Sequence, residues 1–391
     1  FDENNDFKNL AAVGVTFLFL MGLRKELREK NFFDYKKKEP NLSNFLDLVA
    51  LGTVCDVVNL DLYNRSIVTK GLEIIQQRRN LGITKIIDKS NLNSIPNSGD
   101  LGFIIGPQLN AASRIDDSSL PYKLLISKNI DEVEAISKKL ILLNEKRKLI
   151  ENNVFDDAFK QAESQKNQNF IMVHGKDWHN GILGIVASRL TNIFYNPTIV
   201  ISFTNLIGVG SARSINNIDL SNIIIQAKNN NILIVGGGHK MAAGLKINYN
   251  NINKFEIFLK NYFDNFAKNL FQRIEKFDAE ISSNEINNDL LEMLEIMEPF
   301  GSGNPEPKFI IKDIKIASSK VIKNKHILVF FQNDFSDNLK AICFNCVGTN
   351  LGDYLLNYSK QNLALGCSIR KNNFNNLIEP QIIIKDAMIV N

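Results

Sequence analysis

Residues 170–203, which decide the class of fold, read F-I-M-V-H-G-K-D-W-H-N-G-I-L-G-I-V-A-S-R-L-T-N-I-F-Y-N-P-T-I-V-I-S-F. The two ends of this stretch are apolar runs of the length of strands, and residues 182–190 between them have the pattern of a helix. Strand, helix and strand in this order predict a small α/β domain. A later run, N-I-L-I-V at 231–235, is expected to add a strand, and residues 251–270 are expected to form an amphipathic helix.

The segment before this domain predicts one long helix over about residues 130–163. Its apolar residues, among them Val133, Leu140 and Val154, follow a three-four spacing, and no Pro or Gly interrupts the pattern. The charged run E-K-R-K (145–148) is expected on the opposite face. At 1.5 Å per residue the helix would be about 50 Å long, which is enough to connect two domains.

Helices are expected before the long helix, and short strands are expected after the α/β domain. Residues 10–87 read mostly as helices. Their apolar stretch Ala11–Leu23 is shorter than the roughly 20 residues of a membrane span, so we expect a buried helix there. Beyond P-F-G-S-G-N-P-E-P (299–307), short β-rich runs predict a small antiparallel barrel.

Composition excludes several classes of protein. The chain has 391 residues, enough for two or three domains, and its net charge of +4 is not that of a polycation. Four cysteines are too few for a disulfide framework and favour reduced thiols in the cytoplasm. The four histidines assemble neither a Ser-His-Asp set nor a zinc cluster. Because the chain begins with Phe1 and shows no secretion signal, we expect that an upstream segment is missing.

One carboxylate stands out by its surroundings. Asp56 lies in L-D-L-V-A-L-G-T-V-C-D-V-V-N-L (46–60), between apolar residues. An ionised side chain in such a setting is costly unless it is paired, hydrogen-bonded or bound to a cation. A helix cap, a buried hydrogen-bond acceptor and a metal ligand therefore remain open.

Four later segments combine small or polar residues with a basic or imidazole side chain, as phosphate-binding sites do. They are G-P-Q-L-N-A-A-S-R (106–114), which reads as turn-rich, W-H-N-G (178–181) before the helix that carries Arg189, G-S-A-R-S (210–214), and G-G-G-H-K (236–240) directly after a predicted strand. Each alone is also explained as a tight turn, and Arg189 as a solvated arginine that complements the dipole of its helix.

Taken together and in this order, these segments resemble the RecJ family of single-stranded-DNA exonucleases, which belongs to the DHH phosphoesterases. A-L-G-T-V-C-D-V-V-N-L (50–60) is similar to the family's fourth motif, and the four later segments are similar to its following motifs. P-F-G-S-G-N-P-E-P stands where the family's OB-fold domain begins, so the resemblance covers nearly the whole chain.

The resemblance implies an α/β multidomain architecture. It would comprise the helical, C-terminal part of a DHH phosphoesterase domain at 1–127, a connecting helix at 128–165, a DHH-associated, nucleic-acid-binding α/β domain at 166–275, and a linker helix with an OB-fold β-barrel at 276–391. The implied activity is 5'→3' hydrolysis of phosphodiester bonds in single-stranded DNA by metal-activated water, in DNA repair and recombination.

The resemblance also implies roles for particular residues. Asp56 would be the catalytic ligand in a two-metal site for Mn²⁺ or Mg²⁺. The 5'-phosphate and the neighbouring strand would be bound by Asn110, Arg114, Arg189, Ser211, Arg213, Gly237, Gly238 and His239. Single-stranded DNA, a helicase and a single-strand-binding protein are the expected partners of a monomer that meets no membrane.

This sequence lacks some motifs of the family and differs from the family pattern at two positions. The aspartate-rich first motif and the D-H-H motif do not occur in this sequence and would belong upstream of Phe1, so this chain alone is expected to be inactive. Gln108 stands where Arg is usual and would remove a charge near the substrate path; Ser113 stands where Gly is usual. Two alternatives remain: a non-catalytic protein that binds single strands or 5' ends, and a small-substrate DHH phosphodiesterase, against which the C-terminal barrel argues.

Overall fold

The computed structural model describes residues 7–90, 92, 95–332, 339–357, 362–374 and 377–389. The chain divides into two compact units. Unit 1 comprises Phe1–Gln77, Ser94–Phe103 and Glu275–Asn391, and unit 2 comprises Arg78–Asn93 and Ile104–Ile274. Among the described helices, none combines the length and the apolar character that a membrane crossing requires.

Unit 2 contains a helical part and an α/β part. Its α-helices are α4 (Leu81–Lys89), α6 (Gly106–Ile115), α7 (Leu120–Ile126), α8 (Ile130–Glu163), α9 (Leu183–Phe194), α10 (Leu220–Asn229) and α11 (Ile252–Phe263). Its strands are β1 (Ile171–Lys176), β2 (Thr198–Thr204), β3 (Ile207–Arg213), β4 (Val235–His239) and β5 (Ala242–Asn248). Short 3-10 turns lie at Asn180–Ile182, Tyr249–Asn251 and Lys268–Phe271.

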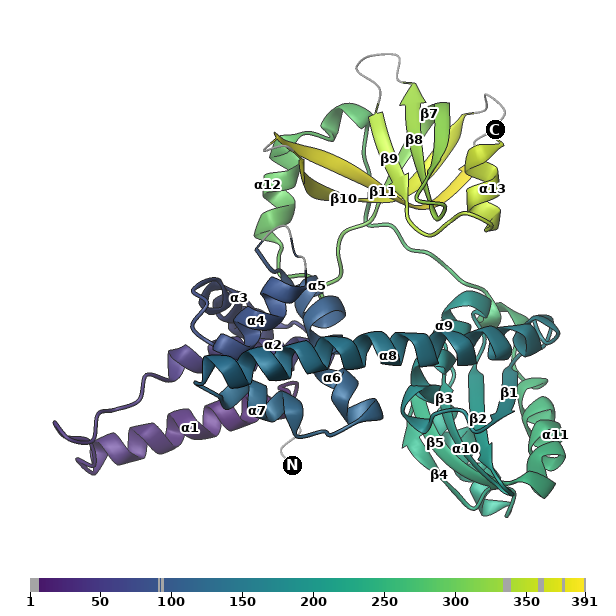
Figure 1. The fold of residues 1–391 in the computed structure, drawn as a ribbon. Helices are drawn as coiled ribbons and strands as arrows, with labels where there is room; N and C mark the ends of the chain where they lie inside the picture. Colours follow the sequence, from purple (N-terminus) through teal and green to yellow (C-terminus); the bar gives the residue numbers. More distant parts are fainter. Residues whose placement is uncertain are drawn as a thin grey trace. The chain divides into compact units, whose positions relative to one another are not determined.

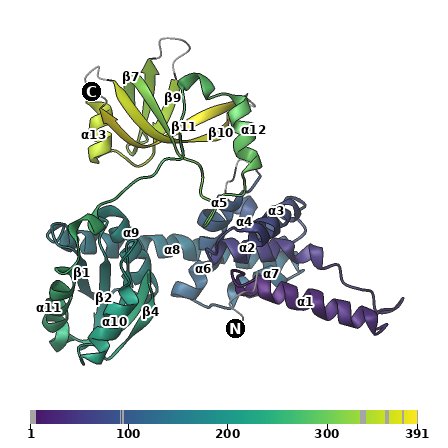
Figure 2. The same ribbon diagram turned by 180° about the vertical axis from the view of Figure 1, so that it is seen from behind.

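The five strands of unit 2 form one sheet in the order β1-β2-β3-β5-β4, with helices on both faces (Figures 1 and 2). β1 and β2 are parallel, and the other neighbours are antiparallel. Because side chains alternate along a strand, Ile199 and Ile201 face α10 and α11, whereas Val200 faces α8 and α9. The predicted α/β domain is therefore present, although the helix expected at 251–270 ends at Phe263.

The long helix α8 runs unbroken from Ile130 to Glu163, where one helix was predicted. Asn129 caps its first turn by accepting hydrogen bonds from the backbone N–H groups of Asp131 and Glu132. One part of α8 packs on α4, α6 and α7, and the other part packs on β1 and α9. The helix thus connects the helical and α/β parts of unit 2.

Two details of the predicted strands of unit 2 are wrong. The run 231–235 was expected to be a strand that ends before the three glycines. Instead β4 begins at Val235 and contains Gly236, Gly237 and Gly238, which pair with β5 at the edge of the sheet. The glycines are part of a strand and do not form a loop that follows one.

Unit 1 contains helices from the first part of the chain and a barrel from the last part. The helices are α1 (Ala12–Glu29), a 3-10 turn (Leu42–Phe45), α2 (Leu46–Cys55), α3 (Leu62–Gln76), α5 (Ser98–Asp100), a 3-10 turn (Ser283–Glu285), α12 (Asn288–Ile296) and α13 (Asn350–Leu356); a π-helical turn (Leu101–Ile105) leads from unit 1 into unit 2. The strands are β6 (Ala279–Glu280), β7 (Phe309–Ile322), β8 (His326–Gln332), β9 (Leu339–Cys343), β10 (Leu363–Phe374) and β11 (Leu377–Ile389).

The C-terminal strands close into a five-stranded barrel. Their order is β7-β8-β9-β11-β10, and pairing of β10 with β7 closes the ring (Figure 1). All these pairs are antiparallel except β9 with β11. A closed barrel of five strands is the architecture expected of an OB fold, and the predicted α/β multidomain class of fold is confirmed.

α1 departs from the expected buried helix. In α1 only Gly14 is buried, whereas Val15 and Phe19 are exposed. Val13 contacts α2 at Gly52, and the rest of α1 extends away from α2 and α3 (Figures 1 and 2). The apolar stretch Ala11–Leu23 therefore does not form a buried helix.

Close packing of α2 on α3 predicts unequal effects of two glycine substitutions. A Cβ on Gly71 would lie 2.2 Å from the Cβ of Ala50 and 2.3 Å from the carbonyl oxygen of Leu46. Gly71→Ala should therefore lower the free energy of unfolding by about 2 kcal/mol or more. Gly22→Ala is the control: no atom lies within 4 Å of its Cβ, so alanine should add about 0.5–1 kcal/mol of helix stability. Urea unfolding followed by circular dichroism measures both, and equal effects would contradict the packing argument.

Candidate functional site

Arg114 is held at the end of α6 by the turn that precedes α9. Its Nη1 donates a hydrogen bond to the carbonyl of Gly181 (3.0 Å). A Cβ on Gly181 would come within 2.3 Å of the carbonyl oxygen of Arg114, so the two backbones can approach this closely because residue 181 is glycine. Residues 106–114 were expected to be turn-rich, and they form helix α6 instead, with Pro107 in the first turn, where its missing N–H is not needed.

Two other residues of α6 face opposite surroundings. Asn110 is exposed one helical turn before Arg114, so the two side chains lie on the same face of α6. Gln108 is buried, and its Nε2 donates to the Oγ of Ser90 (2.8 Å). Gln108 therefore points into unit 2. Its effect on a charge near the substrate path stays a prediction.

Arg213 ends strand β3 beside Ser211 and the beginning of α9. Its Nη1 donates to the Oγ of Ser211 (3.2 Å) and to the carbonyl of Ala212 (2.9 Å). A Cβ on Gly184 would lie 2.7 Å from Nη2 of Arg213 and 3.1 Å from the Oγ of Ser211. Glycine at 184 thus leaves room for the guanidinium and the hydroxyl at the helix.

Arg114 and Arg213 influence each other electrostatically. Burial lowers the pKa of Arg114, and the positive charge of Arg147 lowers it further, while Glu151 acts in the opposite sense. Burial likewise lowers the pKa of Arg213, and the positive charge of Arg114 adds to the effect. Among the described residues, neither guanidinium forms an ion pair with a carboxylate; both donate to neutral oxygens. An anion near these two groups would therefore be strongly stabilised.

A buried carboxylate on α8 joins two further arginines. The Oε2 of Glu151 accepts from Nη1 of Arg147 (2.7 Å), and its Oε1 accepts from Nη1 of Arg189 (3.0 Å). The guanidinium of Arg189 also lies over the ring of Phe155, 3.7 Å from its centroid, and donates to Asn152. Arg189, expected as a phosphate ligand or a solvated arginine, is thus engaged by α8.

Arg147 and Glu151 are site residues that sequence reasoning missed. The run E-K-R-K was expected on the exposed face of the long helix, but Arg147 is buried, so that expectation is wrong for this residue. The signal was present: Leu143, Arg147 and Glu151 continue the three-four spacing of the buried stripe. Two opposite charges one turn apart on an apolar stripe indicate a buried ion pair.

The sheet offers a strip without side chains beside Ser211 and Arg213. Across the strands, Ser211 pairs in register with Gly244 and Gly244 with Gly237. A Cβ on Gly237 would meet no atom within 4 Å, and one on Gly244 would meet one backbone oxygen at 4.0 Å. Glycine weakens a strand, and these two glycines leave the backbone of the sheet open to close approach from outside.

Two other residues of the G-G-G-H-K segment, Gly238 and His239, have different surroundings. Gly238 has a local reason for glycine, because a Cβ would come within 2.3 Å of the carbonyl oxygen of Ala242. His239 is exposed and shares a row of the sheet with Ala242 and Arg213, two strands away from the arginine. Unit 2 therefore brings Arg213 beside Ser211 and close enough to Arg114 to feel its charge, and it places Gly237, Gly238 and His239 on the edge strand β4. Asn110 lies one turn before Arg114 on α6.

Asp56 belongs to unit 1 and ends helix α2. Its side chain is exposed, so the expected burial among apolar residues is wrong. Val57, which follows, has φ of 57°, a left-handed conformation that strains a β-branched residue. The next residues are fixed by the loop after α12: the N–H of Leu60 donates to Ser302 (2.6 Å), and the Oγ of Ser302 donates to Asn59 (2.9 Å).

The residues around Asp56 do not complete a metal centre. Mg²⁺ takes about six oxygen ligands, commonly one or two carboxylates together with water and substrate phosphate. The part of the chain that the structure describes contains no group of three or more His, Cys, Asp or Glu that could hold a metal ion. The exposed carboxylate of Asp56 can serve as one ligand but does not by itself make a site.

Comparison with known proteins identifies the family. A family model described as the RecJ OB domain matches residues 277–386, and one described as the DHHA1 domain matches residues 167–265. The "Single-stranded-DNA-specific exonuclease RecJ" of Haemophilus influenzae is 35% identical over 352 residues, covering 86% of this chain and 61% of that protein. The protein of the same name from Bacillus subtilis is 30% identical over 393 residues, covering 98% of this chain and 47% of that protein. The chain belongs to the RecJ family.

Solved structures support the RecJ fold. A crystal structure of RecJ from Thermus thermophilus in complex with Mn²⁺ matches 97% of this chain with a TM-score of 0.81 and 23% identity, and the match covers 53% of that chain. The complex with Mg²⁺ matches all of this chain with a TM-score of 0.84. This RecJ-family chain spans about half to three-fifths of the length of the relatives that it matches.

The bridge at Glu151 predicts a loss of stability that an anion can offset. Glu151→Gln leaves Arg147 buried without its partner and should lower the free energy of unfolding by about 3 kcal/mol. Inorganic phosphate should then raise the thermal unfolding midpoint of the variant more than that of the unchanged protein, because a bound anion replaces the lost charge.

Glu134→Gln is the matched control for this measurement. Glu134 pairs with Lys85 and Lys89 at the surface, where an ion pair contributes less than about 1 kcal/mol. Equal destabilisation in the two variants, or an equal response to phosphate, would contradict the role of Glu151.

Proposed function

We propose that this RecJ-family chain is part of an enzyme that degrades single-stranded DNA from its 5' end in repair and recombination. One observation carries the proposal: Arg114 and Arg213 are half-buried, Arg213 lies beside Ser211, and no carboxylate among the described residues forms an ion pair with either arginine. A terminal phosphate has three acceptor oxygens and nearly two negative charges, which suits two guanidiniums and a hydroxyl.

The charge of the pocket accounts for the proposed polarity. A phosphate monoester at a strand end carries close to two charges, whereas an internal diester carries one. Two arginines without carboxylate partners among the described residues therefore favour the 5'-phosphorylated end over the interior of a strand. Asn110 and Arg189 would contact the adjoining backbone, and the first nucleotide would lie along Gly237, Gly238 and His239.

For hydrolysis, Asp56 would supply one carboxylate ligand to a divalent cation. Bound Mn²⁺ or Mg²⁺ would provide an activated water and would stabilise the charge on the leaving oxygen. The exposure of Asp56 and the fixed segment after it support this role, since a ligand must be accessible and well positioned.

The barrel of unit 1 would hold the downstream strand. Lys320 on β7 lies over the ring of Phe330 on β8, 5.8 Å from its centroid. A basic group beside an aromatic ring is the combination by which OB folds bind single strands. A helicase and a single-strand-binding protein are the proposed partners, because the substrate must be unwound and kept single-stranded.

The direct test measures product release. The complete gene product, incubated with Mn²⁺ and a 5'-phosphorylated single strand, should release mononucleotides from the 5' end, and Asp56→Asn should abolish this release while single-strand binding stays within about twofold. Products resolved with 5'- and 3'-labelled strands show the direction. Absence of release by a folded protein would reject the proposal.

A second candidate is a protein that binds 5' ends without cleaving them. The observation in its favour is that the described residues contain no group of three or more metal-ligand side chains. It predicts that the complete gene product binds 5'-phosphorylated single strands but releases no nucleotide from them in Mn²⁺ or Mg²⁺.

The proposed pocket predicts selective loss of end recognition. Arg213→Ala should reduce the preference for a 5'-phosphate over a 5'-hydroxyl about tenfold or more, because charge-assisted hydrogen bonds contribute about 1.5–3 kcal/mol. Binding of strand interiors should change far less. Lys228→Ala removes the same charge from α10 and is the control. Competition binding with the two strand ends measures the ratio, and an equal loss on both ends would exclude the pocket.

A further inference from the structure

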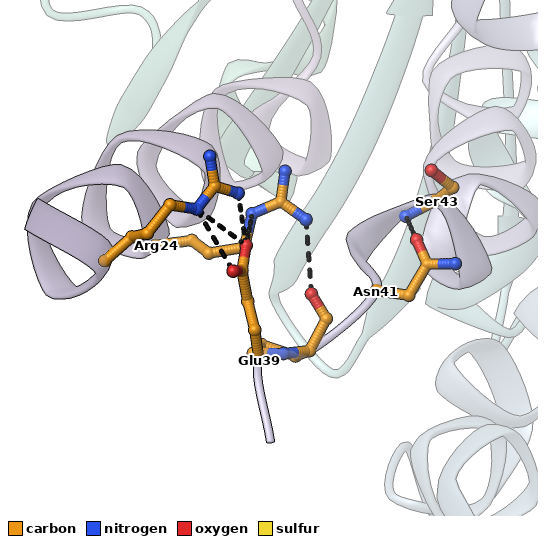
Figure 3. A network of polar contacts seen from close by, with 6 residues as sticks. Arg24, Glu39, Asn41 and Ser43 are labelled. Carbon is orange, nitrogen blue, oxygen red and sulfur yellow. Dashed lines mark hydrogen bonds and ion pairs between the residues drawn. The ribbon is translucent and has the colours of Figure 1, made fainter. Parts of the chain in front are cut away.

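The loop after α1 is held in a defined conformation by its acidic residues. Arg28 on α1 binds the carboxylate of Glu39, with Nε 3.2 and 3.0 Å from its two oxygens. Arg24 on the same helix pairs with Glu39 as well (Figure 3), and it donates from Nη1 to the carbonyl of Pro40 (3.2 Å). These contacts fasten the far end of the loop to the helix that precedes it.

A second carboxylate shapes the tip of the same loop. The Oδ1 of Asp34 accepts hydrogen bonds from the backbone N–H groups of Lys36 and Lys37, both at 2.7 Å, and the N–H of Asp34 donates to the carbonyl of Lys37. The carboxylates of Asp34 and Glu39 are thus engaged by groups of the loop and of α1. These contacts fix the turn from which the side chains at the tip extend.

Aromatic rings and lysines meet at this tip. Tyr35 is 82% exposed and Phe32 is 47% exposed. The Nζ of Lys36 lies 5.4 Å from the centroid of the Tyr35 ring, and the Nζ of Lys37 lies 4.6 Å from that of Phe32. Within the described residues, Lys30, Lys36, Lys37 and Lys38 form no ion pair with a carboxylate. We call Lys30, Phe32, Tyr35 and Lys36–Lys38 the loop patch.

An ordinary solvated loop explains the lysines but not the rings. An aromatic ring that is 82% exposed contributes little to folding, and a turn that displays it next to these lysines keeps apolar and cationic groups together. Proteins that bind single strands without sequence preference combine these two groups, because every base has a face that stacks and every phosphate a negative charge.

We propose that the loop patch binds single-stranded nucleic acid, with bases stacked on Tyr35 and Phe32 and phosphates paired with Lys36, Lys37 and Lys38. This contact goes beyond the proposed recognition of a 5' end. It belongs to unit 1, whereas Arg114 and Arg213 belong to unit 2. It takes the interior of a strand and needs neither an end nor a phosphate monoester.

A closed-circular single strand tests the patch separately from the 5'-phosphate pocket, because it has no end. With the 391-residue chain, Tyr35→Ala should weaken binding to the circle about fivefold or more, while Tyr35→Phe, which keeps the ring, should stay within about twofold. Failure of Arg213→Ala to alter end preference would leave this result unchanged, so the two proposals fail separately.

The lysines are tested with a matched pair of double variants. Lys36→Gln with Lys37→Gln should weaken binding to the circle and reduce the slope of log K against log salt by about 1.4, because two phosphate contacts are lost. Lys254→Gln with Lys260→Gln removes the same charge from α11 and should leave the slope unchanged. Equal slopes for the two variants would overturn the proposal.

Direct contact between the strand and residue 35 is measured with a fluorescent side chain at that position. Tyr35→Trp should be quenched by the circular strand in proportion to binding, whereas the tryptophan that the chain already has at 178 gives the background in the unchanged protein. Absence of additional quenching, or full binding by Tyr35→Ala, would overturn the proposal. Binding of phosphatidylserine vesicles that depends on Tyr35, without binding of the circle, would also overturn the proposal. It would show that the loop patch binds a membrane surface instead.

Discussion

The candidate site depends on an imbalance of charge: one buried carboxylate, that of Glu151, lies among more arginines than it can neutralise. Glu151 is shared by Arg147 and Arg189, while Arg114 and Arg213 donate only to neutral oxygens among the described residues. Glu151 thus pairs with two of the four arginines. The other two have no carboxylate partner among the described residues and could bind an anionic ligand. Since α8 also packs on α6 and α9, the helix that carries Glu151 contacts two of the elements around the proposed phosphate site.

Much of the fold follows from periodicity in the sequence. The strand, helix and strand at 170–203 and the uninterrupted pattern at 130–163 predict β1, α9, β2 and α8, because each element buries one face on a common core. Arg114, Ser211 and Arg213 could be singled out because small residues beside a cation are unusual in strands and helices. Their convergence required the family resemblance, since spacing along the chain does not reveal that the charge of Arg114 on α6 acts on Arg213 of β3.

The remaining errors have a common physical cause, which is that local pattern does not reveal what lies opposite a residue. Arg147 looked exposed because it stands in a charged run, yet its partner Glu151 made burial tolerable. Asp56 looked buried because its neighbours are apolar, yet it lies at a helix end that faces solvent. Gly236–Gly238 looked like a loop because glycine disfavours strands, yet pairing with β5 outweighs that preference.

The composition of β4 also bears on how the sheet avoids self-association. A strand at the edge of a sheet exposes backbone groups that can pair with a second molecule and start an aggregate. In β4 the three central residues are glycines, so a chain that added itself there would gain hydrogen bonds but bury almost no apolar side chain. An edge of this kind can stay open to a strand of nucleic acid while giving a neighbouring protein little reason to remain.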